Sequence, residues 1–93
     1  MNGNTITMAR RLYAIRDDKQ QEFNPPVVIP NDAVASRTFG DYVNKDKSSM
    51  LYVHAGDFSF WYLGSYDAET GLFITDEAAH IICRASDFVS TEE

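Results

Sequence analysis

The chain of 93 residues carries a formal net charge of −6, and 44% of its residues are hydrophobic and 13% aromatic. This composition is typical of one small folded domain and excludes a disordered chain. The acidic whole argues against loose, charge-driven binding to DNA, and no apolar run approaches the roughly 20 residues of a membrane span. We expect a soluble cytoplasmic protein with a single domain over residues 1–93, frayed at about 1–7 and ending in an acidic tail at 90–93.

The first predicted element is a strand over residues 8–16, MARRLYAIR. Alternation places Leu12 and Ala14 on one face and Tyr13 and Ile15 on the other, which favours a central strand that is covered on both sides.

Residues 17–30 are predicted to be a connection. Their three prolines fix φ and remove backbone donors, so residues 27–29 can form an edge strand but not a central one. We expect Phe23 to pack onto the core.

A helix is predicted to begin after Asn31, which favours the N-cap, with Asp32 suited to the positive end of the helix dipole. Its loop follows at residues 44–49. Gly40 costs about 1 kcal/mol in helix propensity against Ala, and its missing side chain would allow close approach to a strand. The predicted stripe that faces the sheet consists of Ala35, Thr38, Phe39 and Tyr42.

The most aromatic stretch, residues 57–74, is predicted to be a hairpin, with Gly71 at positive φ in its turn. It follows residues 50–54, which are either a strand or a loop edge. Alternation places Phe58, Phe60, Tyr62 and Tyr66 on one strand face, and Trp61 and Leu63 on the other.

Residues 75–79 form either one helical turn or a wide loop, and a closing strand is predicted over residues 80–89. Its two faces would carry Ile81, Cys83 and Ala85 on one side and Ile82 and Phe88 on the other. The resulting fold class is α+β, in the order β-loop-α-β-β-β. About four strands would form an antiparallel or mixed sheet with one helix packed on it.

Catalytic or metal-binding chemistry is not indicated. His54 lies three residues before Asp57, but no nucleophile in a strained elbow accompanies this pair, so a loop histidine is favoured. Cys83 lies in an apolar run and is expected to be a buried, inert thiol. One cysteine and two distant histidines give no zinc-ligand spacing. We therefore expect no enzyme, no metal and no cofactor.

The aromatic strand face has two readings. It is either a stacking platform for single-stranded nucleic acid or core beneath the helix, and core is favoured for the Phe58 face. Trp61 and Tyr13 then become candidates for an exposed face or one buried in a dimer. Because so small a domain with open strand edges is marginal alone, we also expect a homodimer.

Three stretches together resemble a known family: residues 12–44, residues 56–74 and the closing ASDFV. They are similar to the small non-structural protein of gokushovirus-type microviruses, which are phages with single-stranded circular DNA. Among the departures, Ala55 and Gly56 follow His54, where family members often carry a His-Pro pair. The matching positions are Leu12, Tyr13, Arg16, Asp17, Pro26, Ala35, Phe39, Val43, Asp57, Phe58, Gly64, Asp67, Thr70 and Gly71.

The resemblance implies a non-structural protein that acts in replication or packaging of a single-stranded DNA genome in the bacterial host. The implied activity is binding without catalysis, either to single-stranded DNA or to the replication initiator.

Any DNA-binding surface must come from the N-terminal half of the chain. Residues 1–47 hold seven basic and six acidic side chains, whereas residues 48–93 hold one basic and eight acidic side chains. A binding groove requires that the basic groups converge on one side of the fold. The candidates are Arg10, Arg11, Arg16, Lys19 and Arg37 for phosphates, and Tyr13 or Trp61 for stacking on bases.

An alternative is a protein–protein adaptor whose acidic half docks on the replication initiator or on a host replication protein. One variant of this alternative is nucleic-acid mimicry, with carboxylates spaced like phosphates. The residues in question are Asp57, Asp67, Glu69, Asp76, Glu77 and Asp87.

Overall fold

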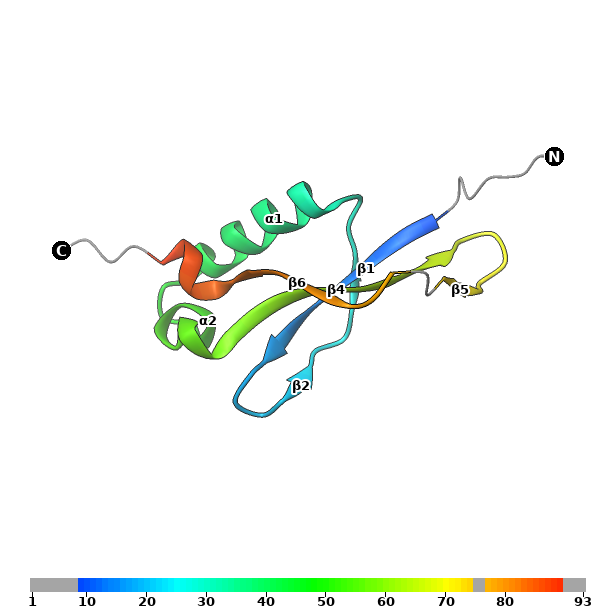
Figure 1. Ribbon diagram of the computed structural model, residues 1–93. Helices are drawn as coiled ribbons and strands as arrows, with labels where there is room; N and C mark the ends of the chain where they lie inside the picture. Colours follow the sequence, from blue (N-terminus) through cyan, green and yellow to red (C-terminus); the bar gives the residue numbers. More distant parts are fainter. Residues whose placement is uncertain (1–8, 75–76, 90–93) are drawn as a thin grey trace.

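The protein is an α+β fold with one antiparallel sheet, seen in a computed structural model that describes residues 9–74 and 77–89 (Figure 1). The expected frayed terminus at residues 1–7 and the acidic tail at 90–93 lie outside these residues. The strands are β1 Ala9–Asp17, β2 Glu22–Phe23, β3 Val27–Val28, β4 Phe58–Asp67, β5 Phe73–Ile74 and β6 His80–Arg84. The helices are α1 Asp32–Lys45 and α2 Met50–Val53, with short 3-10 helices η1 Ala55–Asp57 and η2 Ala85–Phe88.

Strands β1 and β4 form the centre of the sheet and are paired along nearly their whole length, from Ala9 opposite Asp67 to Asp17 opposite Phe58. The other edge of β1 pairs with β2 and β3, and the other edge of β4 pairs with β5 and β6. The prediction that the first strand is central is therefore confirmed, as is the prediction that the proline-flanked valines form an edge strand.

The core lies between the sheet and α1. Phe39 of the helix stacks on Phe60 of β4, with ring centroids 4.6 Å apart and an interplanar angle of 1°. Tyr13 and Tyr62 are buried beside them, so core is the correct reading of this strand face. Side chains of α1, α2 and η2 pack into this same cluster. Tyr13 was expected on an exposed face or one buried in a dimer, and that expectation is wrong because its side chain is in the core.

The helix begins as predicted, because the Asn31 side chain accepts a hydrogen bond from the Val34 backbone N–H. Its buried stripe differs from the prediction: Ala35, Phe39, Gly40 and Val43 are buried, whereas Thr38 and Tyr42 are exposed. Ala35, Phe39 and Val43 follow the spacing of four residues along one ridge, which turns Tyr42 toward solvent.

The hairpin turn is confirmed, with Gly71 at a φ of +81° and its N–H donating to the Asp67 carbonyl. Three other expectations are corrected. Within residues 50–54, Met50–Val53 form helix α2 rather than a strand or a loop edge. The closing strand ends at Arg84 because η2 turns Ala85 into the core. Phe23 is 44% exposed, because a hairpin turn at residues 18–21 pairs it with Arg16 in the sheet. Residues 77–79 are not helical, and residues 75–76 lie outside the described part.

Candidate functional site

The sheet face opposite α1 brings together basic and aromatic side chains. Side chains of directly opposite residues share a face, and Arg16 is opposite both Phe23 and Ser59, while Ser59 is opposite Arg84. Trp61 lies in contact with Phe23, edge to face, with ring centroids 5.8 Å apart. The Arg16 guanidinium carbon lies 5.6 Å from the centre of the Phe23 ring. We call this group the open-face cluster: Arg16, Asp18, Phe23, Ser59, Trp61 and Arg84.

One carboxylate, that of Asp18, holds the polar part of the open-face cluster together. Its Oδ1 accepts from Arg16 Nη1 at 2.7 Å and from Ser59 Oγ at 2.9 Å, and its Oδ2 accepts from Arg84 Nη1 at 3.2 Å. Trp61 Nε1 in turn donates to Ser59 Oγ at 2.8 Å. Partial burial opposes ionisation, but the hydrogen bonds from Arg16 and Ser59 and the two guanidinium charges outweigh it and lower the pKa of Asp18.

The local sequence explains why Phe23 reaches this face. At the end of β1, Asp17 Oδ1 accepts from the backbone N–H groups of Lys19 and Gln20, both at 3.0 Å, which closes a tight turn. Gln21 adopts a φ of +59°, and the chain returns as β2. Lys19 is exposed in this turn, next to the open-face cluster.

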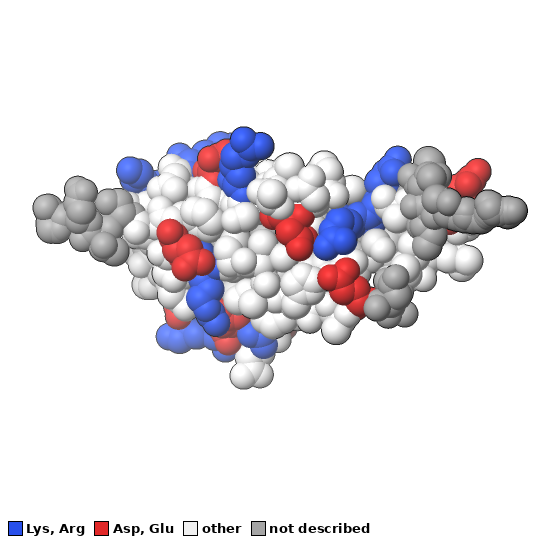
Figure 2. All heavy atoms as spheres, turned by 45° about the horizontal axis from the view of Figure 1, so that its top comes forward, with Lys and Arg blue, Asp and Glu red and all other residues white. Residues whose placement is uncertain are grey.

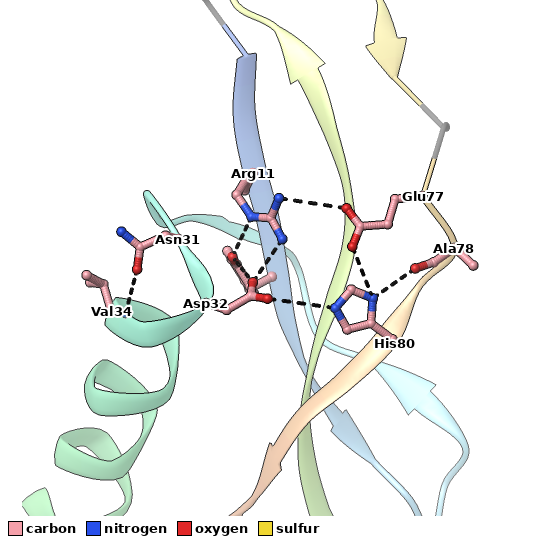
Figure 3. A network of polar contacts seen from close by, with 8 residues as sticks. Arg11, Asn31, Asp32, Val34, Glu77, Ala78 and His80 are labelled. Carbon is pink, nitrogen blue, oxygen red and sulfur yellow. Dashed lines mark hydrogen bonds and ion pairs between the residues drawn. The ribbon is translucent and has the colours of Figure 1, made fainter.

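A second polar network lies at the other side of the sheet, where α1 begins (Figure 3). Asp32 Oδ1 accepts from Tyr13 Oη at 2.6 Å and from Arg11 Nη2 at 2.9 Å, and Arg11 Cζ lies 4.0 Å from the centre of the Tyr62 ring. His80 extends the network, with Nε2 at 3.9 Å from Asp32 Oδ2. The hydrogen bond from Tyr13 lowers the pKa of Asp32, while burial and the bond to Asp32 raise the pKa of Tyr13 to about 12. These contacts join the helix N-terminus to the sheet.

The predicted nucleic-acid candidates do not all converge. Arg16 and Trp61 belong to the open-face cluster and Lys19 adjoins it, whereas Arg11 and Tyr13 are engaged in the network at the start of α1. The remaining two candidates are Arg10, exposed on β1 opposite Tyr66, and Arg37, exposed on α1. A single groove built from the whole set is therefore excluded. On the face shown in Figure 2, Lys and Arg side chains lie beside Asp and Glu side chains rather than in a continuous basic surface.

Four members of the open-face cluster were not among the predicted site residues: Asp18, Phe23, Ser59 and Arg84. Phe23 was expected in the core, although the Asp17-Asp18-Lys19 turn signal could have predicted a hairpin that places it beside Arg16. Arg84 was treated only as the one basic residue of the acidic half. No local signal places it next to Asp18, which is 66 positions away in the chain.

Several acidic residues considered for nucleic-acid mimicry have local partners. Asp67 Oδ1 accepts from Glu69 N–H at 2.8 Å in the hairpin turn, and Asp87 Oδ2 accepts from Arg84 N–H at 2.9 Å at the start of η2. Glu77 lies 3.8 Å from Arg11. Asp76 lies outside the described residues.

The other residues considered for chemistry lie apart from one another. His54 is exposed at the end of α2, and Cys83 is half-buried, with its thiol pKa raised by burial. Within residues 9–74 and 77–89, no group of three or more His, Cys, Asp or Glu side chains is placed to hold a metal ion. A surface hollow of about 390 Å³ lies between β3 and α1, and its lining includes Val27, Ile29 and Tyr42.

No helix in the described part of the chain is long and apolar enough to cross a membrane. The fold and the open-face cluster define a small α+β protein with one helix-covered sheet face and one face that carries arginines and aromatic rings. Residues 10–88 match the family model described as Phage ORF5 protein, and the chain belongs to this family of phage proteins. No curated protein and no solved structure matches it.

Proposed function

We propose that this phage protein binds single-stranded DNA through the open-face cluster, without catalysis, and acts in replication or packaging of a single-stranded genome in the host cytoplasm. The stage of infection comes from the resemblance to the small non-structural protein of gokushovirus-type microviruses. The observation that carries the binding activity is the pair of rings, Trp61 and Phe23, flanked by Arg16 and Arg84 on a sheet face.

The chemistry of the cluster favours single strands over duplex. Unpaired bases can stack on aromatic side chains that stand on a sheet, whereas bases inside a duplex present only their edges. The two guanidinium groups supply phosphate contacts, which position the strand without reading its sequence. The net charge of −6 opposes binding, so we expect a dissociation constant in the micromolar range or weaker.

A fluorescence titration with labelled oligonucleotides, at low and moderate salt, tests this proposal. Trp61 is the only tryptophan, so its intrinsic emission also reports directly on the site. Single strands should bind more tightly than duplex of the same length. With at most two arginine contacts, the slope of log affinity against log salt should be no steeper than about −1.4, from about −0.7 per phosphate.

Matched variants separate the open-face cluster from the rest of the surface. Phe23→Ala should weaken binding by about five-fold or more, since one stacked base contributes about 1–3 kcal/mol. Arg84→Ala should weaken it and make the salt dependence shallower. The controls are Phe73→Ala at the exposed hairpin tip and Arg37→Ala on the exposed side of α1, which should leave the affinity unchanged.

If no binding occurs at tens of micromolar protein and low salt, the DNA proposal is wrong. The adaptor hypothesis would then take its place, and copurification with the replication initiator or a host replication protein, in the absence of DNA, would support it.

We further propose that the protein is a homodimer that pairs along the β3 side of the sheet. Val27 and Val28 of this edge strand are 50% and 49% exposed, and Tyr42 of α1, 53% exposed, lies across the same hollow as Val27. A second copy would cover both the free strand edge and these apolar side chains. Light scattering should give twice the chain mass, and Val28→Lys should return it to the monomer mass. A monomer at high micromolar concentration would refute this proposal.

A further inference from the structure

The Asp18 carboxylate is bound in the way that an oxyanion ligand would be bound. Its two oxygens take hydrogen bonds from one guanidinium of β1, one guanidinium of β6 and the hydroxyl of Ser59. Planar guanidinium groups bind carboxylates and phosphates with the same donor geometry. The donors that would bind a phosphate on this face are therefore already directed at an anion that belongs to the chain.

We propose that Asp18 is a built-in competitor of the DNA phosphate, so that its carboxylate occupies the place of a backbone phosphate on the open face and limits the affinity for single strands. This inference rests on the proposed function and concerns the regulation of the same site.

The position of Asp18 keeps its carboxylate next to the two arginines. Its backbone N–H donates to the Asp57 carbonyl at 2.8 Å, which holds the residue close to the start of β4. Partners that favour the charged carboxylate keep its pKa low, so it remains ionised near neutral pH. An incoming phosphate must therefore either displace this anion or bind beside it against charge repulsion.

The network also provides a direct readout of this exchange. Ser59 is 1% exposed, donates to Asp18 and accepts from Trp61 Nε1. A change at the Asp18 carboxylate therefore alters the hydrogen bond of the indole, and it should change the emission of the protein's only tryptophan.

Asp18→Asn is the primary test, because it removes the charge and keeps the shape and an acceptor oxygen. The variant should bind an oligo-dT single strand about tenfold more tightly than wild type at low salt. Its salt slope should be steeper than that of wild type and close to about −1.4, because both arginines that Asp18 engages become available to phosphates. Asp41→Asn, which changes the same charge on an exposed position of α1, should shift the affinity by less than about twofold.

A second variant and a second probe guard against a folding defect and against stacking effects. Asp18→Ser also removes the charge and should tighten binding in the same direction, and thermal unfolding of both variants verifies that they are folded. Inorganic tripolyphosphate has no bases, so its binding, followed by Trp61 emission, isolates the anion site. It should bind Asp18→Asn more tightly than wild type.

The outcomes distinguish this inference from the proposed function. If wild type binds the single strand and the folded Asp18 variants bind equally or more weakly, Asp18 positions the arginines instead, and only the inference is overturned. If neither wild type nor the variants bind either probe, both are overturned. Tighter binding by both Asp18 variants but not by Asp41→Asn supports the inference.

Discussion

Gly40 is the position where one added methyl group gives the sharpest test of the packing. A Cβ atom on Gly40 would lie 2.6 Å from Cδ1 and 2.7 Å from Cε1 of Phe88, far inside the 3.5–4.0 Å at which carbon atoms are in favourable contact. The backbone that carries this ring is held in place. Asn44 Nδ2 donates to both the Gly40 and the Phe88 carbonyls, each at 3.1 Å, and so holds η2 against α1.

Two effects of opposite sign therefore compete in Gly40→Ala. The substitution gains about 1 kcal/mol in helix propensity but overpacks a tight contact, which typically costs about 1–3 kcal/mol. We expect a net decrease of up to about 2 kcal/mol in the free energy of unfolding. Urea unfolding followed by circular dichroism measures it.

Truncation of the ring should reverse the sign of the effect. In a Phe88→Ala background the steric clash is absent, so adding Gly40→Ala should raise the free energy of unfolding by about 1 kcal/mol. If Gly40→Ala stabilises the otherwise wild-type protein, or if its effect is the same in both backgrounds, the proposed contact between α1 and η2 is wrong.

Three further predictions concern single side chains. Gly71→Val should lower the melting temperature by several degrees, since φ is +81° at this position and a β-branched residue there is strained by more than about 1 kcal/mol. An unchanged melting temperature would refute the assignment of this turn. Asn31→Ala should cost about 1 kcal/mol in urea unfolding through loss of the helix cap, whereas Asn31→Asp should be nearly neutral, and equal effects would argue against capping. The pKa of Tyr13, raised to about 12, means that the folded state holds the phenol proton more tightly than the unfolded state. Its stabilising contribution is complete below about pH 10 and is lost between about pH 10 and 12. Tyr13→Phe should flatten the decline in unfolding free energy over that range, and parallel curves for the two proteins would contradict this cause.

Much of the fold could be predicted from short-range signals in the sequence. The cap at Asn31, the positive φ at Gly71 and the edge position of the valines between prolines each follow from the backbone chemistry of a few neighbouring residues. Alternation in residues 8–16 likewise predicted a central strand, because both of its faces carry apolar side chains. These features need no knowledge of what lies elsewhere in the chain.

The candidate site could not be predicted in the same way, because it is formed by contacts between residues far apart in the sequence. Alternation separates the faces of a strand but does not say which face a helix covers, so Tyr13 was expected at the surface and is in the core. The closing strand ends early because η2 fits against Gly40, more than forty positions away. Arg16 and Arg84 meet at Asp18 only because β1 and β6 pair with opposite edges of β4. Local propensity predicted most of the elements, whereas the burial of apolar surface between distant elements decided where the closing strand ends and which side chains remain on the open face.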